Sequence, residues 1–118
     1  ADPTMALVAT GFGYAADRRA FQAEILRSLL PEIRDIRRAG SAAVDICWLA
    51  DGKVDAFYEK GLNPWDYTAA WVIAREVGIE LAGLDGRAPN PDLTIGANPV
   101  LFTKLHDRLK ELGADRAV

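Results

Sequence analysis

The chain has 118 residues, of which half are hydrophobic and 26% are charged, as is usual for one globular domain. Its net charge of −3 argues against direct binding of nucleic acid, which selects a basic surface. One cysteine and one histidine cannot supply four ligands to a zinc ion, and no apolar run reaches the roughly 20 residues of a membrane-spanning helix.

The beginning of the chain carries no secretory signal, and its one cysteine, Cys47, cannot form an internal disulfide. We therefore expect a cytoplasmic protein that does not contact a membrane. Residues 1–5 read as a tag or linker, and residues 6–118 are expected to form one domain.

The first half of the chain is expected to begin with a short apolar strand, residues 6–10, which runs into a Gly-Phe-Gly turn. Apolar residues then recur every four positions within residues 17–30, as in an amphipathic helix that stops at Pro31. Residues 33–39 alternate poorly and predict only a weak strand. A compact apolar helix follows over residues 41–49, with Ser41 as its N-cap.

The second half starts with a strand over residues 53–59 and continues with a helix over residues 64–77. Asn63 and Pro64 are the N-cap and the first helical residue, and Gly78 ends the helix. The buried stripe of this helix is expected to consist of apolar residues at helical spacing, namely Trp65, Ala69, Val72 and Ile73.

A further short strand is expected over residues 93–97, before a last helix that Asn98 caps and Pro99 begins. Its buried stripe consists of leucines at helical spacing, Leu101, Leu105, Leu109 and Leu112. Strand and helix thus alternate about four times, which favours an α/β fold, a layered sandwich in which helices cover a mixed β-sheet.

Two carboxylates flank the corner between the strand at residues 53–59 and the helix that follows it. Glu59 stands at the end of the strand, and Asp66 lies in the first turn of the helix. Carboxylates that converge on such a corner suit a hard cation such as Mg²⁺ or the hydroxyl groups of a polyol. An acidic residue in a first turn is also explained by the helix dipole, so Asp66 could serve as a cap alone. The backbone N–H groups of residues 40–42 offer a further place for an anion or a hydroxyl oxygen.

Two further polar features, a histidine and a basic cluster, are expected to be solvated surface. His106 lies on the polar side of the last helix and is expected to be a solvated surface residue. A local basic cluster stands in a charged edge segment that we also expect to be solvated: Arg34, Arg37 and Arg38.

Three blocks of the chain resemble the inositol monophosphatase family in their order and spacing. They are residues 40–47 (Gly-Ser-Ala-Ala-Val-Asp-Ile-Cys), 52–59 (Gly-Lys-Val-Asp-Ala-Phe-Tyr-Glu) and 61–66 (Gly-Leu-Asn-Pro-Trp-Asp). The Trp-Asp pair is a fairly specific signature, and the later Gly-Ala-Asn-Pro at residues 96–99 is similar as well. The resemblance covers nearly the whole chain from about Leu7 onward.

This resemblance implies a hydrolase: a Mg²⁺-dependent, Li⁺-inhibited phosphomonoesterase that acts on inositol phosphates or related sugar phosphates. Asp66 matches the aspartate that ligates the catalytic metal at the substrate site. Glu59 matches the glutamate that accepts hydrogen bonds from the inositol hydroxyls, and Ala42 matches an alanine whose backbone contacts the same ring. The resemblance also predicts a homodimer.

The family's other metal carboxylates have no counterpart in this chain. They lie in an earlier glutamate and in an Asp-Pro-(Ile/Leu)-Asp-Gly-Thr motif, which also binds phosphate. The chain therefore resembles the C-terminal half of such an enzyme, a truncated fragment that would need the missing N-terminal half. One metal carboxylate does not make a two-metal site, so we expect the isolated chain to be inactive.

Two alternatives remain open at this point. The first is a non-catalytic protein-interaction domain of the same fold, because some bacterial relatives are implicated in transcription complexes. The second is a bisphosphate substrate, such as a bisphosphate nucleotide or fructose bisphosphate. The absence of extra basic residues beside Glu59 favours a monophosphate.

Overall fold

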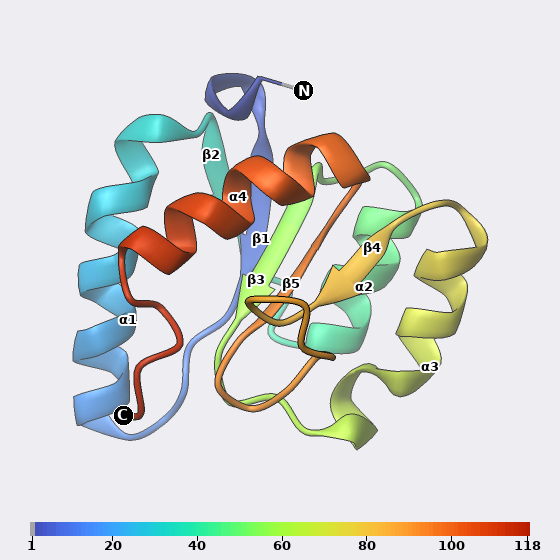
Figure 1. Cartoon of the computed structure of the whole chain (residues 1–118). Helices are drawn as coiled ribbons and strands as arrows, with labels where there is room; N and C mark the ends of the chain where they lie inside the picture. Colours follow the sequence, from blue (N-terminus) through green and yellow to red (C-terminus); the bar gives the residue numbers. More distant parts are fainter. Residues whose placement is uncertain (1) are drawn as a thin grey trace.

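A computed structural model describes residues 2–118 of the chain, and a five-stranded sheet forms its centre (Figure 1). The strands are β1 (Leu7–Thr10), β2 (Asp35–Arg37), β3 (Ala56–Glu59), β4 (Glu80–Ala82) and β5 (Thr94–Ala97), in the order β2-β1-β3-β5-β4. β1 runs parallel to both of its neighbours, whereas β5 is antiparallel to both β3 and β4. The predicted mixed sheet is confirmed.

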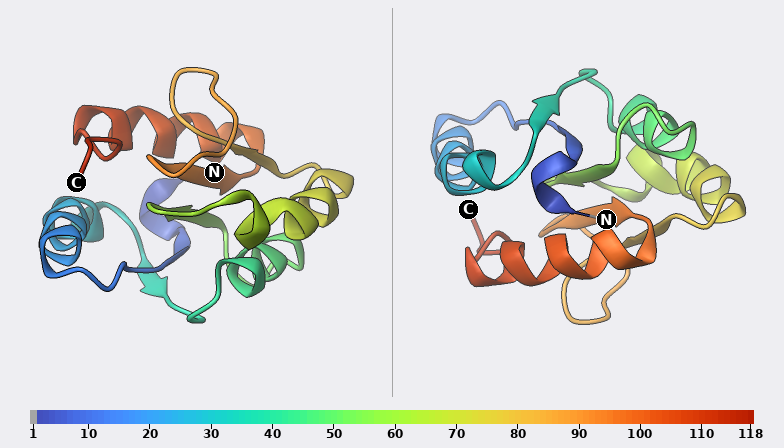
Figure 2. Two further views of the ribbon diagram at one scale, coloured as in Figure 1. Left: turned by 90° about the horizontal axis from the view of Figure 1, so that it is seen from below. Right: turned by 90° about the horizontal axis from the view of Figure 1, so that it is seen from above.

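Two pairs of helices cover the two faces of the sheet (Figure 2). The helices α1 (Ala16–Leu29) and α4 (Pro99–Glu111) lie on one face, and α2 (Ala42–Ala50) and α3 (Pro64–Glu76) lie on the other. Short 3-10 helices precede β1 and follow α1, at Pro3–Met5 and Leu30–Glu32. The three layers confirm the predicted α/β sandwich.

Alternate residues of the strands divide the core into two clusters, because successive side chains of a strand point to opposite faces. Val8 and Tyr58 belong to the cluster beneath α1 and α4, whereas their neighbours Ala9 and Phe57 belong to the cluster beneath α2 and α3. The leucine stripe of α4 packs into the first cluster as predicted, with Leu109 fully buried.

Local sequence signals explain where the helices begin. Ser41 Oγ accepts the N–H of Val44 at 3.3 Å, and Asn98 Oδ1 accepts the N–H of Leu101 at 3.0 Å. Proline occupies the first helical position of both α3 and α4, where a missing N–H costs nothing. Each of these helices therefore starts within one residue of its predicted position.

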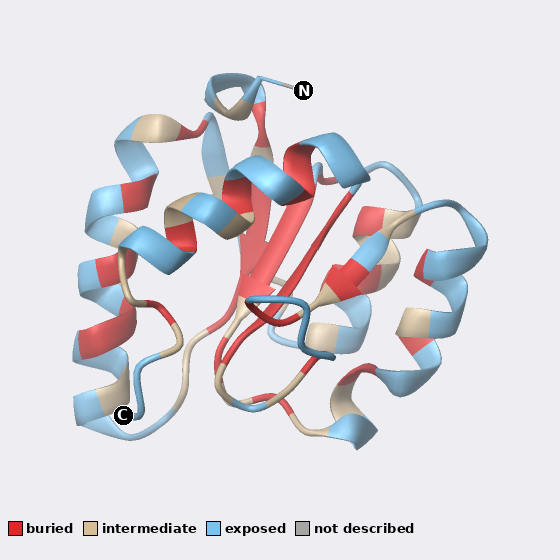
Figure 3. Cartoon of the chain, in the orientation of Figure 1, coloured by how far each residue is buried: buried red, intermediate tan, exposed pale blue. Residues whose placement is uncertain are grey.

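The predicted buried stripe of α3 is wrong. Trp65 is 81% exposed, Val72 49% and Ile73 51%, and Ala69 is exposed as well (Figure 3). The helix instead buries the residues that lie toward α2 and the sheet, which are Tyr67, Ala70 and Ala74. Small alanines let two helices approach closely, so α3 packs on α2 through its alanine face. The face with the larger apolar side chains stays exposed.

β4, a three-residue edge strand between Gly78 and Gly83, was not predicted from the sequence. Two predicted strands are also shorter than expected, since β2 covers only Asp35–Arg37 and β3 begins at Ala56. Within residues 2–118, no helix combines the length and the apolar character needed to cross a membrane.

Candidate functional site

The topology of the sheet marks the place where a ligand is expected. β1 and β3 are parallel neighbours, so their carboxyl ends meet at one edge, the lower end of the sheet in Figure 1. The chain leaves β1 for α1 on one face and leaves β3 for α3 on the other face. In open α/β sheets this reversal opens a crevice in which ligands bind.

A cavity of about 560 Å³ lies at this edge, within the usual size range of small-molecule sites. Its walls come from the loop after β1, the start of α2, the end of β3 and the start of α3. The three residues singled out in the sequence all line it: Ala42, Glu59 and Asp66. Residues from three separate elements are thus brought together around one space.

Asp66 serves as a cap of α3. Its Oδ2 atom accepts the backbone N–H of Asn63 at 2.9 Å, which satisfies one of the free donors at the helix start. The capping interpretation of Asp66 is therefore correct. Because Asp66 also lines the cavity, the cap does not exclude a second role as a metal ligand.

Glu59 lies in an environment that disfavours its ionised form. Burial raises the pKa of the Glu59 carboxyl, the nearby carboxylates of Asp45 and Asp66 also raise it and Arg38 lowers it, and together these effects bring the pKa to about 7. The backbone of Gly11 presses against the same carboxyl, since a Cβ atom at Gly11 would lie 2.5 Å from Glu59 Oε1. A larger residue at this position would require the Glu59 carboxyl to shift.

Asp45 is a functional candidate that was not predicted from the sequence. It is 1% exposed, lines the cavity and accepts the N–H of Ala39 through Oδ1 at 3.1 Å. Burial raises the pKa of the Asp45 carboxyl, whereas the Ala39 bond and the Arg38 charge lower it. The available signal was an acidic residue inside the otherwise apolar helix of residues 41–49.

Three basic residues also line the cavity, and one expectation needs correction because of them. They are Arg18, Arg38 and Lys60. Arg38 is exposed, as expected, but it also lies close enough to Asp45 and Glu59 to lower the pKa of both carboxyls. The site also does not lack basic residues beside Glu59, because Lys60 and Arg18 stand at its edge.

Gln22 of α1 fixes the loop that follows β1. Its Oε1 atom accepts the N–H of Gly13 at 2.8 Å, and its Nε2 atom donates to the carbonyl of Gly11 at 3.3 Å. Phe12 between these glycines lies under two guanidinium groups, 5.9 Å from Arg19 and 5.8 Å from Arg38. The cavity wall on this side is therefore held from α1 and from the segment before α2.

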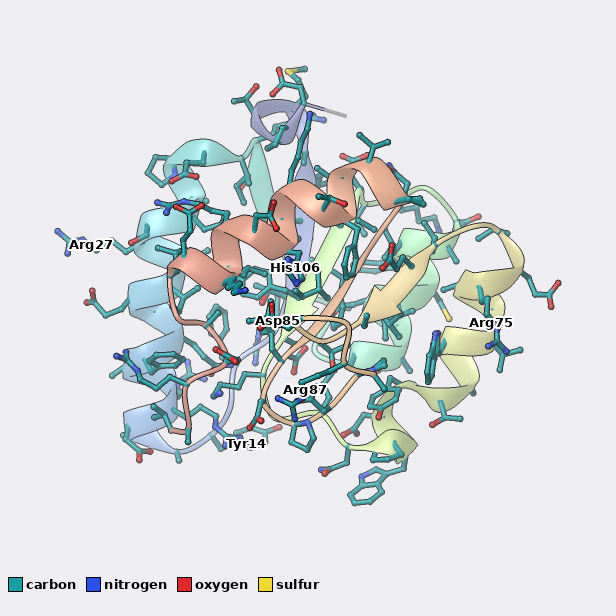
Figure 4. All side chains as sticks on the ribbon, in the orientation of Figure 1. Tyr14, Arg27, Arg75, Asp85, Arg87 and His106 are labelled. Carbon is teal, nitrogen blue, oxygen red and sulfur yellow. The ribbon has the colours of Figure 1, made fainter. Side chains whose placement is uncertain are left out.

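His106 is not a freely solvated residue as expected. It lies beside Asp85 (Figure 4), and its Nε2 atom accepts the backbone N–H of Asp85 at 3.0 Å. Its ring stacks on Phe102. It does not line the cavity at the carboxyl edge, and its neighbours give it a structural role in holding the loop after β4.

The donor atoms at the cavity fit part of a magnesium site. Across residues 2–118, no three His, Cys, Asp or Glu side chains are grouped so that they could hold a metal ion by themselves. Mg²⁺ commonly keeps several waters and binds through one or two carboxylates and the phosphates of a substrate. Asp66 offers one such carboxylate, and further ligands would have to come from outside the described chain.

The comparison with protein families gives one match to nearly the whole chain. The model of the "Inositol monophosphatase family" matches residues 2–115. Among curated proteins, the chain is 44% identical over 100 residues to "Inositol-1-monophosphatase" of Mycobacterium leprae, covering 83% of this chain and 34% of the relative. It is also 44% identical over 73 residues to "Nus factor SuhB" of Salmonella typhimurium, covering 61% of this chain and 27% of the relative.

Solved structures agree with these matches. The chain superposes on Mycobacterium tuberculosis SuhB with a TM-score of 0.84 at 37% sequence identity. The superposition covers 98% of this chain and 45% of that chain. The chain thus spans about a third of the length of the curated relatives and somewhat less than half of the solved relative.

Proposed function

The chain belongs to the inositol monophosphatase family, and on this premise we propose that it forms the substrate-holding part of a Mg²⁺-dependent phosphomonoesterase. The substrate is inositol monophosphate or a related sugar phosphate. The observation that carries the proposal is the convergence of Ala42, Glu59 and Asp66 on one cavity at the carboxyl edge of the sheet.

Each of the three residues has a role that suits its chemistry. The Asp66 carboxylate supplies a hard oxygen ligand for the metal. The Glu59 carboxylate accepts hydrogen bonds from the hydroxyl groups of the polyol ring. The backbone of Ala42, at the start of α2, contacts the same ring. Mg²⁺ bound at Asp66 would polarise the phosphoryl group and lower the pKa of a bound water.

Arg38 and Asp45 stabilise the positions of these site residues. Asp45 is buried and bonded to the N–H of Ala39, so it fixes the turn that leads into α2. Arg38 places a positive charge beside two carboxyl groups that would otherwise repel each other. These residues hold the polyol side of the cavity in shape without contacting the phosphate.

The chain does not contain the full set of ligands that a two-metal phosphatase uses. Its relatives are two to three times as long as the part that matches, so we propose that the remaining ligands and the phosphate-binding motif come from an N-terminal half. The chain by itself is then an inactive half of the enzyme.

The test is Mg²⁺-dependent phosphate release from inositol 1-phosphate, measured for this chain and for the full-length gene product at equal molar concentration. We expect release only by the longer protein. Release by neither protein would contradict the proposed activity. Release by the 118-residue chain would show that Asp66 does not need carboxylate ligands from another segment.

A second candidate function is a protein-interaction domain without catalysis. It is favoured by the relatives named "Nus factor SuhB", a name that refers to another role than phosphate release. The exposed apolar residues of α3 would then serve to bind a partner protein. A full-length product that is folded and dimeric, but inactive on every sugar phosphate tested, would favour this candidate.

A further inference from the structure

The Glu59 carboxyl lies against the backbone of Gly11, on the far side of the cavity wall from the substrate space. A Cβ atom built on Gly11 would lie 2.5 Å from Glu59 Oε1, 2.7 Å from Cδ and 2.9 Å from Oε2, so the whole carboxyl group faces this glycine. Across residues 2–118, Glu59 forms no ion pair. The position of its oxygen atoms therefore depends on where the backbone of Gly11 lies.

The segment that carries Gly11 has no regular structure of its own. β1 ends at Thr10, whose Oγ1 atom donates to the carbonyl of Tyr58 at 2.7 Å and ties the ends of β1 and β3 together. The chain then passes through Gly-Phe-Gly and reaches the next regular element, α1, only at Ala16. Two glycines in three residues leave the backbone many conformations, so contacts from outside the segment must select one.

Gln22, in the second turn of α1, supplies these contacts. Its side chain is 7% exposed, and both ends of its carboxamide bind the backbone of the segment. The Oε1 atom accepts the N–H of Gly13 at 2.8 Å, and the Nε2 atom donates to the carbonyl of Gly11 at 3.3 Å. Because Gly11 is buried as well, removal of the carboxamide would leave a buried carbonyl without its partner.

The two hydrogen bonds explain why a polar side chain is buried at this position of α1. The neighbouring inward residues Phe21 and Ile25 belong to the apolar cluster beneath α1 and α4. A carboxamide buried there without partners would be unfavourable, and its bonds to the segment after β1 offset that cost. Methionine has a similar length and can bury the same stem, but it has no donor and only a weak acceptor. Gln22→Met therefore removes the hydrogen bonds and keeps most of the packing.

We propose that Gln22 is a positioning residue for polyol recognition, because it holds Gly11, and through Gly11 the Glu59 carboxyl, where the substrate hydroxyls meet it. The inference rests on the proposed function, in which Glu59 accepts those hydrogen bonds. Gln22 does not line the cavity and does not touch the substrate. Its effect falls on binding of the polyol ring and not on the metal beside Asp66.

The kinetic test compares inositol 1-phosphate with phenyl phosphate, which offers Glu59 no ring hydroxyl, as substrates of the full-length protein. Gln22→Met should raise KM for inositol 1-phosphate about tenfold with a much smaller change in kcat, as for the loss of a hydrogen bond to a charged group. The preference for inositol 1-phosphate over phenyl phosphate, measured as the ratio of kcat/KM, should fall by the same factor.

The matched control is Glu24→Met, which replaces a polar side chain of similar length at an exposed position on the same helix. We expect this variant to keep the wild-type preference. Equal losses by Gln22→Met on both substrates would show that Gln22 supports the fold alone, and would overturn the positioning role.

Two further measurements separate this inference from the proposed function, because they need neither metal nor turnover. Hydrogen exchange in the segment 11–14, followed by mass spectrometry, should be faster in Gln22→Met than in the wild type and unchanged in Glu24→Met. Calorimetric titration of inositol 1-phosphate in EDTA should show weaker binding by Gln22→Met. These two results support the inference even if neither protein releases phosphate. Unchanged exchange, or a wild-type KM in a Gln22→Met protein that hydrolyses inositol 1-phosphate, would overturn it and leave the proposed function intact.

Discussion

At the scale of single residues, the Glu59 carboxyl couples the site to the stability of the fold. Its pKa is about 7 in the folded chain, against an ordinary value of 4.5, because it is buried beside Asp45 and Asp66. Between these pH values the folded state keeps a proton that the unfolded state has lost. Stability must therefore fall as the pH rises through this interval.

Glu59→Gln should remove this pH dependence, because glutamine has no proton to lose. We expect the variant to be more stable than the wild type at pH 8, by about 1–3 kcal/mol, and equally stable near pH 4.5. Urea unfolding in EDTA at both pH values measures the difference. The control is Glu76→Gln, at an exposed position on α3. Parallel pH profiles of wild type and Glu59→Gln would contradict the assigned environment of Glu59.

The substitution Asp66→Asn distinguishes the role of Asp66 as a cap of α3 from its role as a metal ligand. An asparagine oxygen can still accept the N–H of Asn63, so the fold should persist with a loss of about 1 kcal/mol or less. Turnover by the full-length protein should fall by about two to three orders of magnitude, because the charge that holds the metal is lost. Asp51→Asn, at an exposed turn, is the control. Wild-type turnover and Mg²⁺ dependence in Asp66→Asn would refute the metal assignment.

The site residues that the sequence revealed are those with local signals. Glu59 ends a strand and Asp66 follows an N-cap and a proline, so both could be located from a few neighbouring letters. Arg18 has no such signal, because the start of α1 and the end of β3 meet only through the pairing of β1 and β3, whereas the signal of Asp45 was its place inside an otherwise apolar helix. The pairing of distant strands brings charged residues to the cavity that no short motif identifies.

At the scale of elements, substitutions at the contact between α2 and α3 test which face of α3 is buried. Ala74 is fully buried toward α2, whereas Ala69 on the same helix is exposed. Ala74→Leu should lower the free energy of unfolding by about 1–3 kcal/mol through overpacking, and Ala69→Leu should change it little. Urea unfolding of the two variants decides the matter. Equal costs would mean that α3 is packed through the face predicted from the sequence.

Helix starts were predictable and packing faces were not. Caps and prolines act within a few residues, which is why α3 and α4 begin where Asn63 and Asn98 indicate. α3 carries apolar residues on two of its faces, so the spacing of apolar residues could not show which face is buried. β4 could not be predicted because three residues are too few to show an alternation of apolar and polar side chains.

At the scale of the whole molecule, the exposed side of α3 is the surface that most needs a partner. It presents Trp65, Val72 and Ile73, and Val77, which is 58% exposed, directly follows the helix. The homodimer that the family resemblance suggests remains a prediction, and this stripe is where we expect the second copy to pack.

Replacing both Val72 and Ile73 by lysine should weaken self-association of the full-length protein, because two charges would be buried in the contact. Sedimentation velocity at several concentrations measures the effect. Glu80→Lys changes the net charge by the same amount at the edge strand and serves as the control. A dimer unaffected by the double substitution would place the interface elsewhere.

The pairing of β1 with β3 also governs the order in which the chain can fold. Val8 pairs with Ala56, 48 positions later, which is the widest separation among the four strand pairings. Closing so long a loop costs more entropy than forming β4–β5 and the helix after it, so this pairing is expected late in folding. The cavity does not exist before that step. A polyol phosphate should consequently slow the unfolding rate of the protein while leaving its refolding rate unchanged.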